Sequence, residues 1–173
     1  MKIYKQMMFL AFSFIILSCS ETSQEDLIKK AEAPLLDGMG IHTHKVTTNR
    51  ASQKYFNQGL ILSFAFNHAE SIRSFKAAQR LDPNCAMCYW GEALSRGPNI
   101  NVTSDGKVVM SPQDRKDAFK AIEKAKELMS SVSAKEQDYI LALSSRYNGE
   151  IGTDRSDLDI NYALAMEALS QKY

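Results

Sequence analysis

The chain has few of the residues on which enzymes and metal proteins usually depend. Its 173 residues include three histidines, three cysteines and a single tryptophan. The sequence contains no G-x-S-x-G, no H-E-x-x-H and no phosphate-binding loop. Its formal net charge is +1 and its lysines and arginines form no cluster, so nothing predicts binding to nucleic acid. We therefore expect a protein that is not an enzyme and uses no cofactor.

Apolar runs long enough to span a bilayer are not evident either. The apolar run at 9–17 has nine residues, whereas a spanning helix needs about 20. Lys2 and Lys5 precede this run, which is the pattern of a signal peptide. The next residues, Ile16-Leu17-Ser18-Cys19, resemble the lipobox of bacterial lipoproteins. The resemblance implies cleavage before Cys19, a lipid such as palmitate on its thiol, and a membrane of the bacterial cell envelope, expected to be the outer one. The alternative is a soluble secreted protein in which Cys19 merely lies near the cleavage site.

Residues 55–83 contain two patterns of helical period that combine small with large side chains. The first is Y-x3-G-x2-L and the second is S-x3-F-x2-A, with a break at Phe66-Asn67-His68 between them. The small residues would let two helices approach closely, and the large ones would fill the space beside them. Pro83 then ends the second helix, because proline cannot continue it. The residues of the two patterns are Tyr55, Gly59, Leu62, Ser71, Phe75 and Ala78.

These patterns resemble one tetratricopeptide repeat (TPR), which has a period of about 34 residues. Tyr89 lies 34 residues after Tyr55. The second pattern recurs 47 residues on, because a loop at 98–111 lengthens this repeat. A third unit begins at Ser133. The recurrent residues are Ala118, Ile122 and Ala125. We predict an all-α fold, a short TPR-type solenoid of antiparallel helical hairpins with about six helices, preceded by a signal peptide.

The chain divides into three parts on this interpretation. Residues 1–18 form the signal peptide, 19–48 a tether and connector, and 49–173 the helical repeat domain. Within the middle part, 20–34 is a polar tether with a short helix near 26–33, and 35–49 is a connector without periodicity. The last helix has no cap or stop signal, which is the pattern of a repeat array truncated at its C-terminus.

Capping rules predict where four helices begin. Two alternatives, Asn49 and Ser52, remain for the first repeat helix. The other expected caps are Asn84 before a helix beginning at Cys85, Ser111 before Pro112, and Ser133 in a capping box with Glu136.

The ordered series of motifs GMGIHTH, TT, YFNQGL, FAFNHAESIRSF, LDPNCAMCYWGEAL and GPNIN extends the resemblance. It is similar to a family of bacterial exported TPR proteins with an FNH turn and a GPNIN loop, and it covers about 35–147. The resemblance implies a fold and no particular reaction. Grooves of TPR folds bind extended peptides or partner helices. A protein or peptide partner is therefore expected, with Asn99, Asn101 and Tyr89 as the candidate binding residues.

Cys85 and Cys88 form the most reactive pattern in the sequence. If Asn84 caps the helix, Cys85 is its first residue, where the helix dipole favours a thiolate. A c-type haem site needs C-x-x-C-H, and Tyr89 follows instead. A zinc site would need a second ligand pair at matching spacing, which the sequence does not supply. A disulfide, a pair of free thiols and a metal or redox site remain open, and the last is the alternative to a peptide-binding role.

Three histidines, His42, His44 and His68, could join these sulfurs in a copper site. His68 and Cys85 lie at the two ends of one predicted helix, roughly 20 Å apart at 1.5 Å per residue. One metal ion cannot bind both. His68 is instead expected to be a turn residue whose ring bonds a backbone group. No metal site is predicted, and in the alternative interpretation Cys85 and Cys88 are the metal ligands.

Overall fold

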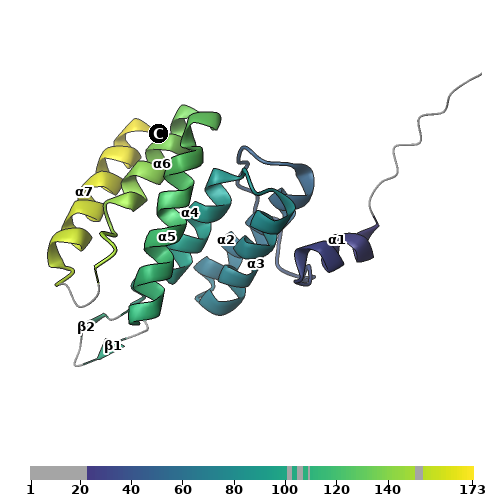
Figure 1. Cartoon of the computed structure of the whole chain (residues 1–173), viewed down its shortest axis with the longest axis horizontal. Helices are drawn as coiled ribbons and strands as arrows, with labels where there is room; N and C mark the ends of the chain where they lie inside the picture. Colours follow the sequence, from purple (N-terminus) through teal and green to yellow (C-terminus); the bar gives the residue numbers. More distant parts are fainter. Residues whose placement is uncertain (1–22, 101–102, 105–106, 109, 151–153) are drawn as a thin grey trace, which may run out of the picture.

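The computed structural model describes residues 23–100, 103–104, 107–108, 110–150 and 154–173. This part of the chain is helical apart from one short pair of strands (Figure 1), which confirms the predicted all-α class. The predicted signal peptide and Cys19 lie outside the described residues. None of the helices described is long and apolar enough to cross a membrane. The helices are α1 (Gln24–Ala31), α2 (Arg50–Phe64), α3 (His68–Leu81), α4 (Ala86–Arg96), α5 (Pro112–Leu128), α6 (Ala134–Ser144) and α7 (Ser156–Lys172), with a 3-10 turn at Met129–Ser131.

Successive helices pack against each other in pairs (Figure 1). α2 and α3 are joined by residues 65–67 alone and form a hairpin, and α4 with α5 and α6 with α7 form two more. α3 also packs on α4, and α5 on α6, so the hairpins share one continuous core. Of the seven α-helices in the described residues, six lie from Arg50 onward, and α1 is additional.

The first hairpin has the close helix approach that its small residues predict. The Ser71 hydroxyl on α3 donates a 2.6 Å hydrogen bond to the Gly59 carbonyl on α2. Phe75 is fully buried, and its ring lies against Gly59. The same ring also lies against Gly91 of α4, a glycine that the sequence patterns did not single out. Phe75 therefore joins the first hairpin to the second.

Three predicted helix starts are confirmed. The Asn49 side chain accepts from the Ser52 backbone N–H at the start of α2. Ser111 caps α5, which has proline in its first turn. Ser133 and Glu136 form the full capping box of α6. These signals are local, so the sequence alone is enough to find them.

The prediction for the start of α4 is wrong. Cys85, not Asn84, is the N-cap residue, and its sulfur accepts the Cys88 backbone N–H at 3.1 Å. Asn84 is exposed and donates its own backbone N–H to Asp82. The turn after α3 therefore uses Asp82 to hold Asn84, and the cap position falls one residue later.

The described part of the predicted tether at 20–34 belongs to the folded part, and α1 stands where a short helix is predicted near 26–33. α1 packs on α3, and its buried face presents Leu27 and Ala31. The Arg80 side chain donates to the Ala31 carbonyl, and the Tyr55 hydroxyl donates to the Ala33 carbonyl at 2.7 Å. A few apolar residues on one face are sufficient for this contact, so the polar composition did not reveal it.

The predicted loop at 98–111 is not entirely irregular. It contains strands β1 (Thr103–Ser104) and β2 (Lys107–Val108), which pair antiparallel with Thr103 opposite Val108. Figure 1 shows this small hairpin projecting from the end of the helical stack.

Candidate functional site

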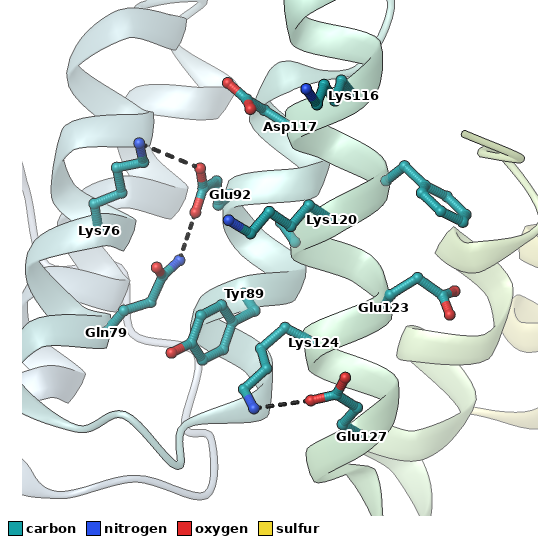
Figure 2. A pocket seen from close by; sticks show the side chains of 12 residues that line it. Lys76, Gln79, Tyr89, Glu92, Lys116, Asp117, Lys120, Glu123, Lys124 and Glu127 are labelled. Carbon is teal, nitrogen blue, oxygen red and sulfur yellow. Dashed lines mark hydrogen bonds and ion pairs between the residues drawn. The ribbon is translucent and has the colours of Figure 1, made fainter. Parts of the chain in front are cut away.

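A groove runs between α3 and α5, with α4 along its floor (Figure 2). Its volume is about 690 Å³, which is within the size range of ligand sites in proteins. Each of the three helices contributes side chains, so the groove exists only where the first and second hairpins meet. Its lining residues are Lys76, Gln79, Tyr89, Glu92, Lys116, Asp117, Phe119, Lys120, Ala121, Glu123, Lys124 and Glu127.

Glu92 is the buried acid of the groove floor. It is 6% exposed, and Arg96 one turn later donates its Nε–H to the carboxylate at 2.9 Å. From α3, Gln79 donates its amide at 2.8 Å, and the Lys76 ammonium lies 3.7 Å away. A buried carboxylate needs this degree of pairing to remain charged. The cluster fixes α3 to α4 at the bottom of the groove.

Arg96 carries the same network to α5. Its Nη1 lies 3.0 Å from Asp114 and 3.3 Å from Asp117, while its Nε bonds Glu92. One guanidinium therefore joins three carboxylates on two helices. The network therefore fixes α5 relative to α4.

The rim of the groove offers hydrogen-bond donors. Figure 2 shows Lys120 reaching from α5 across the groove, and within the described residues neither Lys116 nor Lys120 has an ion-pair or hydrogen-bond partner. Lys124, by contrast, is paired with Glu127 at 2.8 Å. Burial raises the pKa of the Tyr89 phenol, so it stays protonated near neutral pH. Ammonium groups and a phenol thus surround an otherwise apolar hollow.

Of the two predicted partner-binding residues that lie in the described part of the chain, only one lines the groove. Tyr89 lines the groove. Asn99 is half-buried just after α4 and does not line it, and Asn101 lies outside the described residues. Sequence reasoning missed Lys120 and Glu92. A signal for part of the site was present, since Lys116, Lys120 and Lys124 are spaced four apart and share one face of a helix.

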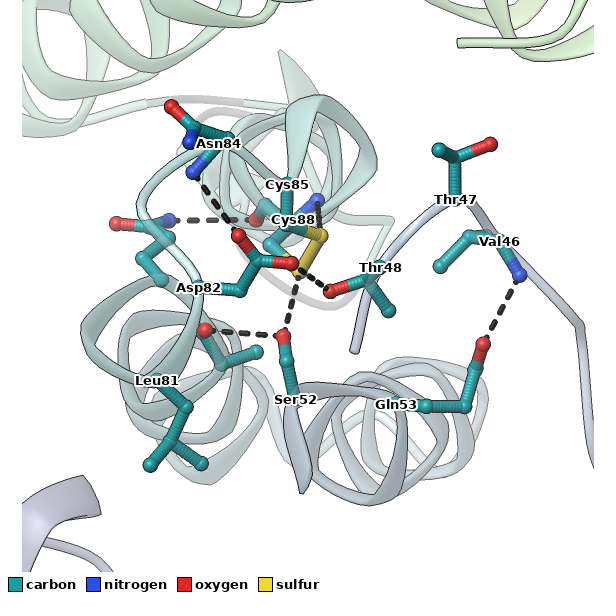
Figure 3. The surroundings of a disulfide bond; sticks show 12 residues. Val46, Thr47, Thr48, Ser52, Gln53, Leu81, Asp82, Asn84, Cys85 and Cys88 are labelled. Carbon is teal, nitrogen blue, oxygen red and sulfur yellow. Dashed lines mark hydrogen bonds between the residues drawn. A yellow bond between two sulfur atoms is a disulfide. The ribbon is translucent and has the colours of Figure 1, made fainter. Parts of the chain in front are cut away.

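Cys85 and Cys88 form a disulfide (Figure 3), one of the three states that the sequence left open. Both residues are fully buried. The Ser52 hydroxyl of α2 lies 3.4 Å from the Cys88 sulfur, and Gln79 donates to the Cys88 carbonyl at 3.2 Å. The bond thus lies where α2, α3 and α4 converge. In this state neither sulfur is a thiolate, which is the form that binds metals or attacks disulfides.

The histidines lie apart from the sulfurs. His68 is the first residue of α3 and Cys85 follows its far end, as predicted. The expected bond from the His68 ring to the backbone is wrong, because neither ring nitrogen has a hydrogen-bond partner in the described residues. The Asn67 side chain caps α3 instead, and the His68 ring packs edge-on against Phe66 with centroids 6.1 Å apart. Among the described residues, no group of three or more His, Cys, Asp or Glu could hold a metal ion.

A comparison of the chain with known protein families, curated proteins and solved structures gives no match.

Proposed function

We propose that the protein is a membrane-anchored TPR scaffold that binds a protein or peptide partner in the bacterial cell envelope. The groove between α3, α4 and α5 is the observation that carries this proposal. The pairwise stacking of the helices supports the TPR interpretation. So does the contact of Ser71 with Gly59, a close helix approach of the kind that small residues allow.

The groove is suited to binding because the charged side chains of its floor pair with one another, while donors on its rim remain available. The charges of the floor satisfy one another, as Arg96 and Lys76 do for Glu92. The donors of the rim, Lys116, Lys120 and the Tyr89 phenol, are available to a ligand. A peptide segment could offer acidic side chains or backbone carbonyls to the donors of the rim. An apolar side chain of the same segment could fill the hollow.

Photo-crosslinking tests the groove. A photoreactive p-benzoylphenylalanine replaces Lys120 in the groove, and in a matched protein it replaces Lys30, an exposed lysine of α1 that does not line it. We expect a discrete crosslinked partner from position 120 in living cells and none from position 30. Tyr89→Ala should reduce the product without loss of helix content. Identical products from both positions, or none from position 120, would contradict the proposed role of the groove.

Membrane anchoring is tested separately through Cys19. Cys19→Ala should move the protein from the membrane fraction to the soluble fraction, because the thiol to be lipidated is gone. A variant that stays with the membrane and is processed normally would contradict the lipoprotein assignment while leaving the groove argument intact.

A redox-responsive lipoprotein is the second candidate, and the Cys85–Cys88 disulfide is the observation that favours it. Exchange requires a thiolate to reach one of the sulfurs, and both residues are fully buried. Reduction of the folded protein should therefore be slow and limited by local opening. Fast reduction by a small thiol, accompanied by a change in partner crosslinking, would favour this candidate.

A further inference from the structure

Residues 42–48 lie on the surface of α2 without forming helix or sheet, and we refer to this segment as the strap. Its backbone is held by side-chain amides. His44 donates its N–H to Asn57 at 3.3 Å, and Val46 donates to Gln53 at 3.0 Å (Figure 3 shows the second bond). The Gln53 amide returns a 2.9 Å bond to the His44 carbonyl. In an extended chain alternate residues face the same side. The backbone N–H groups of His44 and Val46 therefore both point toward α2.

The end of the strap is fastened to α6. Glu136 is 6% exposed and accepts both the Thr47 backbone N–H and the Thr47 hydroxyl at 2.6 Å each. It also accepts from the backbone and hydroxyl of Ser133, its own capping box. Burial acts to raise the pKa of Glu136, but the hydrogen bonds from Ser133 and Thr47 outweigh it and hold the pKa below its ordinary value. One carboxylate therefore joins segments 89 residues apart in sequence.

Aromatic rings form the middle of this surface. The His44 ring lies 6.3 Å from that of Phe56 on α2 and 6.2 Å from that of Tyr139 on α6, between centroids. Trp90 of α4 packs edge-on against Tyr139 at 5.9 Å and donates its indole N–H to the Tyr139 carbonyl. Trp90 is the only tryptophan of the chain, so its fluorescence reports on the surface beneath the strap.

Charged neighbours act on His44 as well. Burial lowers the pKa of the His44 imidazole, the charges of Lys135 and His42 lower it further, and Glu136 acts in the opposite direction. Protonation of His44 is therefore less favourable while the strap lies on α2 than it would be in water.

The strap contributes a single side chain, Val46, to the core. Its neighbours Lys45 and Thr47 are exposed. The packing beneath, including the fully buried Phe56 and the nearly buried Trp90, lies between helices. Release of the strap would therefore remove one core side chain and uncover polar amides and Glu136. This surface is distinct from the groove, because Trp90 contacts α6 whereas Tyr89 and Glu92 of the same helix line the groove.

We propose that the face formed by α2 and α6 is a binding surface for an extended peptide, and that the strap is its resident intramolecular ligand. The contacts define the chemistry of a competing segment. It presents free backbone N–H groups at the positions of His44, Val46 and Thr47, which excludes proline there. It has an aliphatic side chain in place of Val46 and a hydroxyl in place of Thr47. Because the strap is tethered, its effective concentration suppresses such a partner until the strap is released.

The test uses a labelled peptide of residues 41–49 and three forms of the full mature chain. These are the wild type, Val46→Asp, which makes burial of the strap unfavourable, and Thr47→Pro, which removes the N–H donated to Glu136. We expect the peptide to bind both variants at least tenfold more tightly than the wild type, with a change in Trp90 fluorescence. A control peptide with proline at the position of Val46 should not bind, and Glu136→Gln added to either variant should weaken binding.

Two variants are used so that a folding defect in one, detected by circular dichroism, leaves the other as the test. Equal peptide affinity for the wild type and the variants would overturn the proposal, as would equal binding of the proline control. Absence of binding to a folded variant would show that the strap is purely structural. None of these outcomes depends on Lys120 crosslinking, so failure here is distinguishable from failure of the proposed groove function.

Discussion

Replacing Gly91 by alanine should destabilise the protein, although alanine is the better helix former. A Cβ at Gly91 would lie 2.2 Å from the Phe75 ring, whereas one at Gly59 would lie 2.9 Å from the opposite edge of the same ring. The fully buried ring is held between the two glycines, so it cannot move away from one without pressing on the other. Over-packing of this kind costs about 1–3 kcal/mol.

A 2.2 Å contact with a fixed ring places the cost in the upper part of this range, about 2–3 kcal/mol, and the helix preference of alanine offsets about 1 kcal/mol of it. We therefore expect Gly91→Ala to lower the free energy of unfolding by about 1–2 kcal/mol, or on the order of 2–8 °C in melting temperature for a chain of this size. Gly59→Ala, whose 2.9 Å contact with the ring is also too short for a Cβ, should destabilise the protein as well, but by less than Gly91→Ala. Urea unfolding followed by circular dichroism measures both.

A double-mutant cycle identifies the cause. Phe75→Leu removes the ring that the new methyl group would strike, so Gly91→Ala should cost less in that background, with a coupling of about 1 kcal/mol or more. The reasoning is refuted if Gly91→Ala is as stable as the wild type, or if its effect simply adds to that of Phe75→Leu.

Two further predictions concern the cysteine pair and pH. Cys85→Ser with Cys88→Ser should keep the helix content and cost about 1–2 kcal/mol at most, because so short a loop constrains the unfolded chain little; loss of helix in circular dichroism would contradict this. Acid should loosen the strap. The stabilising effect of neutral His44 is fully present above its ordinary pKa of 6.5 and is lost as the pH falls through the lower folded value. That of Glu136 is present above 4.5 and lost as the pH falls through its own lowered value. The protection factors of the strap amides, which correct the exchange rates for the intrinsic pH dependence of amide exchange, should decrease as the pH falls below 6.5, and His44→Phe should remove that change; an unchanged decrease in the variant would show that another group is responsible.

Local patterns in the sequence were sufficient for the helical class and for several of its details. The helix starts at Asn49 and Ser133 follow from capping, which involves residues within one turn. The contact between Gly59 and Phe75 follows from a hairpin joined by three residues, 65–67, where a short connection leaves the second helix little freedom. Such features depend on neighbours in sequence, and a sequence displays them directly.

Only the tertiary structure decided where the two proposed binding surfaces lie. The groove requires the side of α3 to meet the side of α5, and the lysines of α5 alone did not show what lies opposite them. Gly91 contacts Phe75 across two hairpins, and Cys85 replaces Asn84 as a cap because of how the turn after α3 closes. Thr47 reaches Glu136 over a separation of 89 residues. No local periodicity records such pairs, because the stacking of separate hairpins brings them together and the connector at 35–49 has no pattern of its own to reveal where it lies.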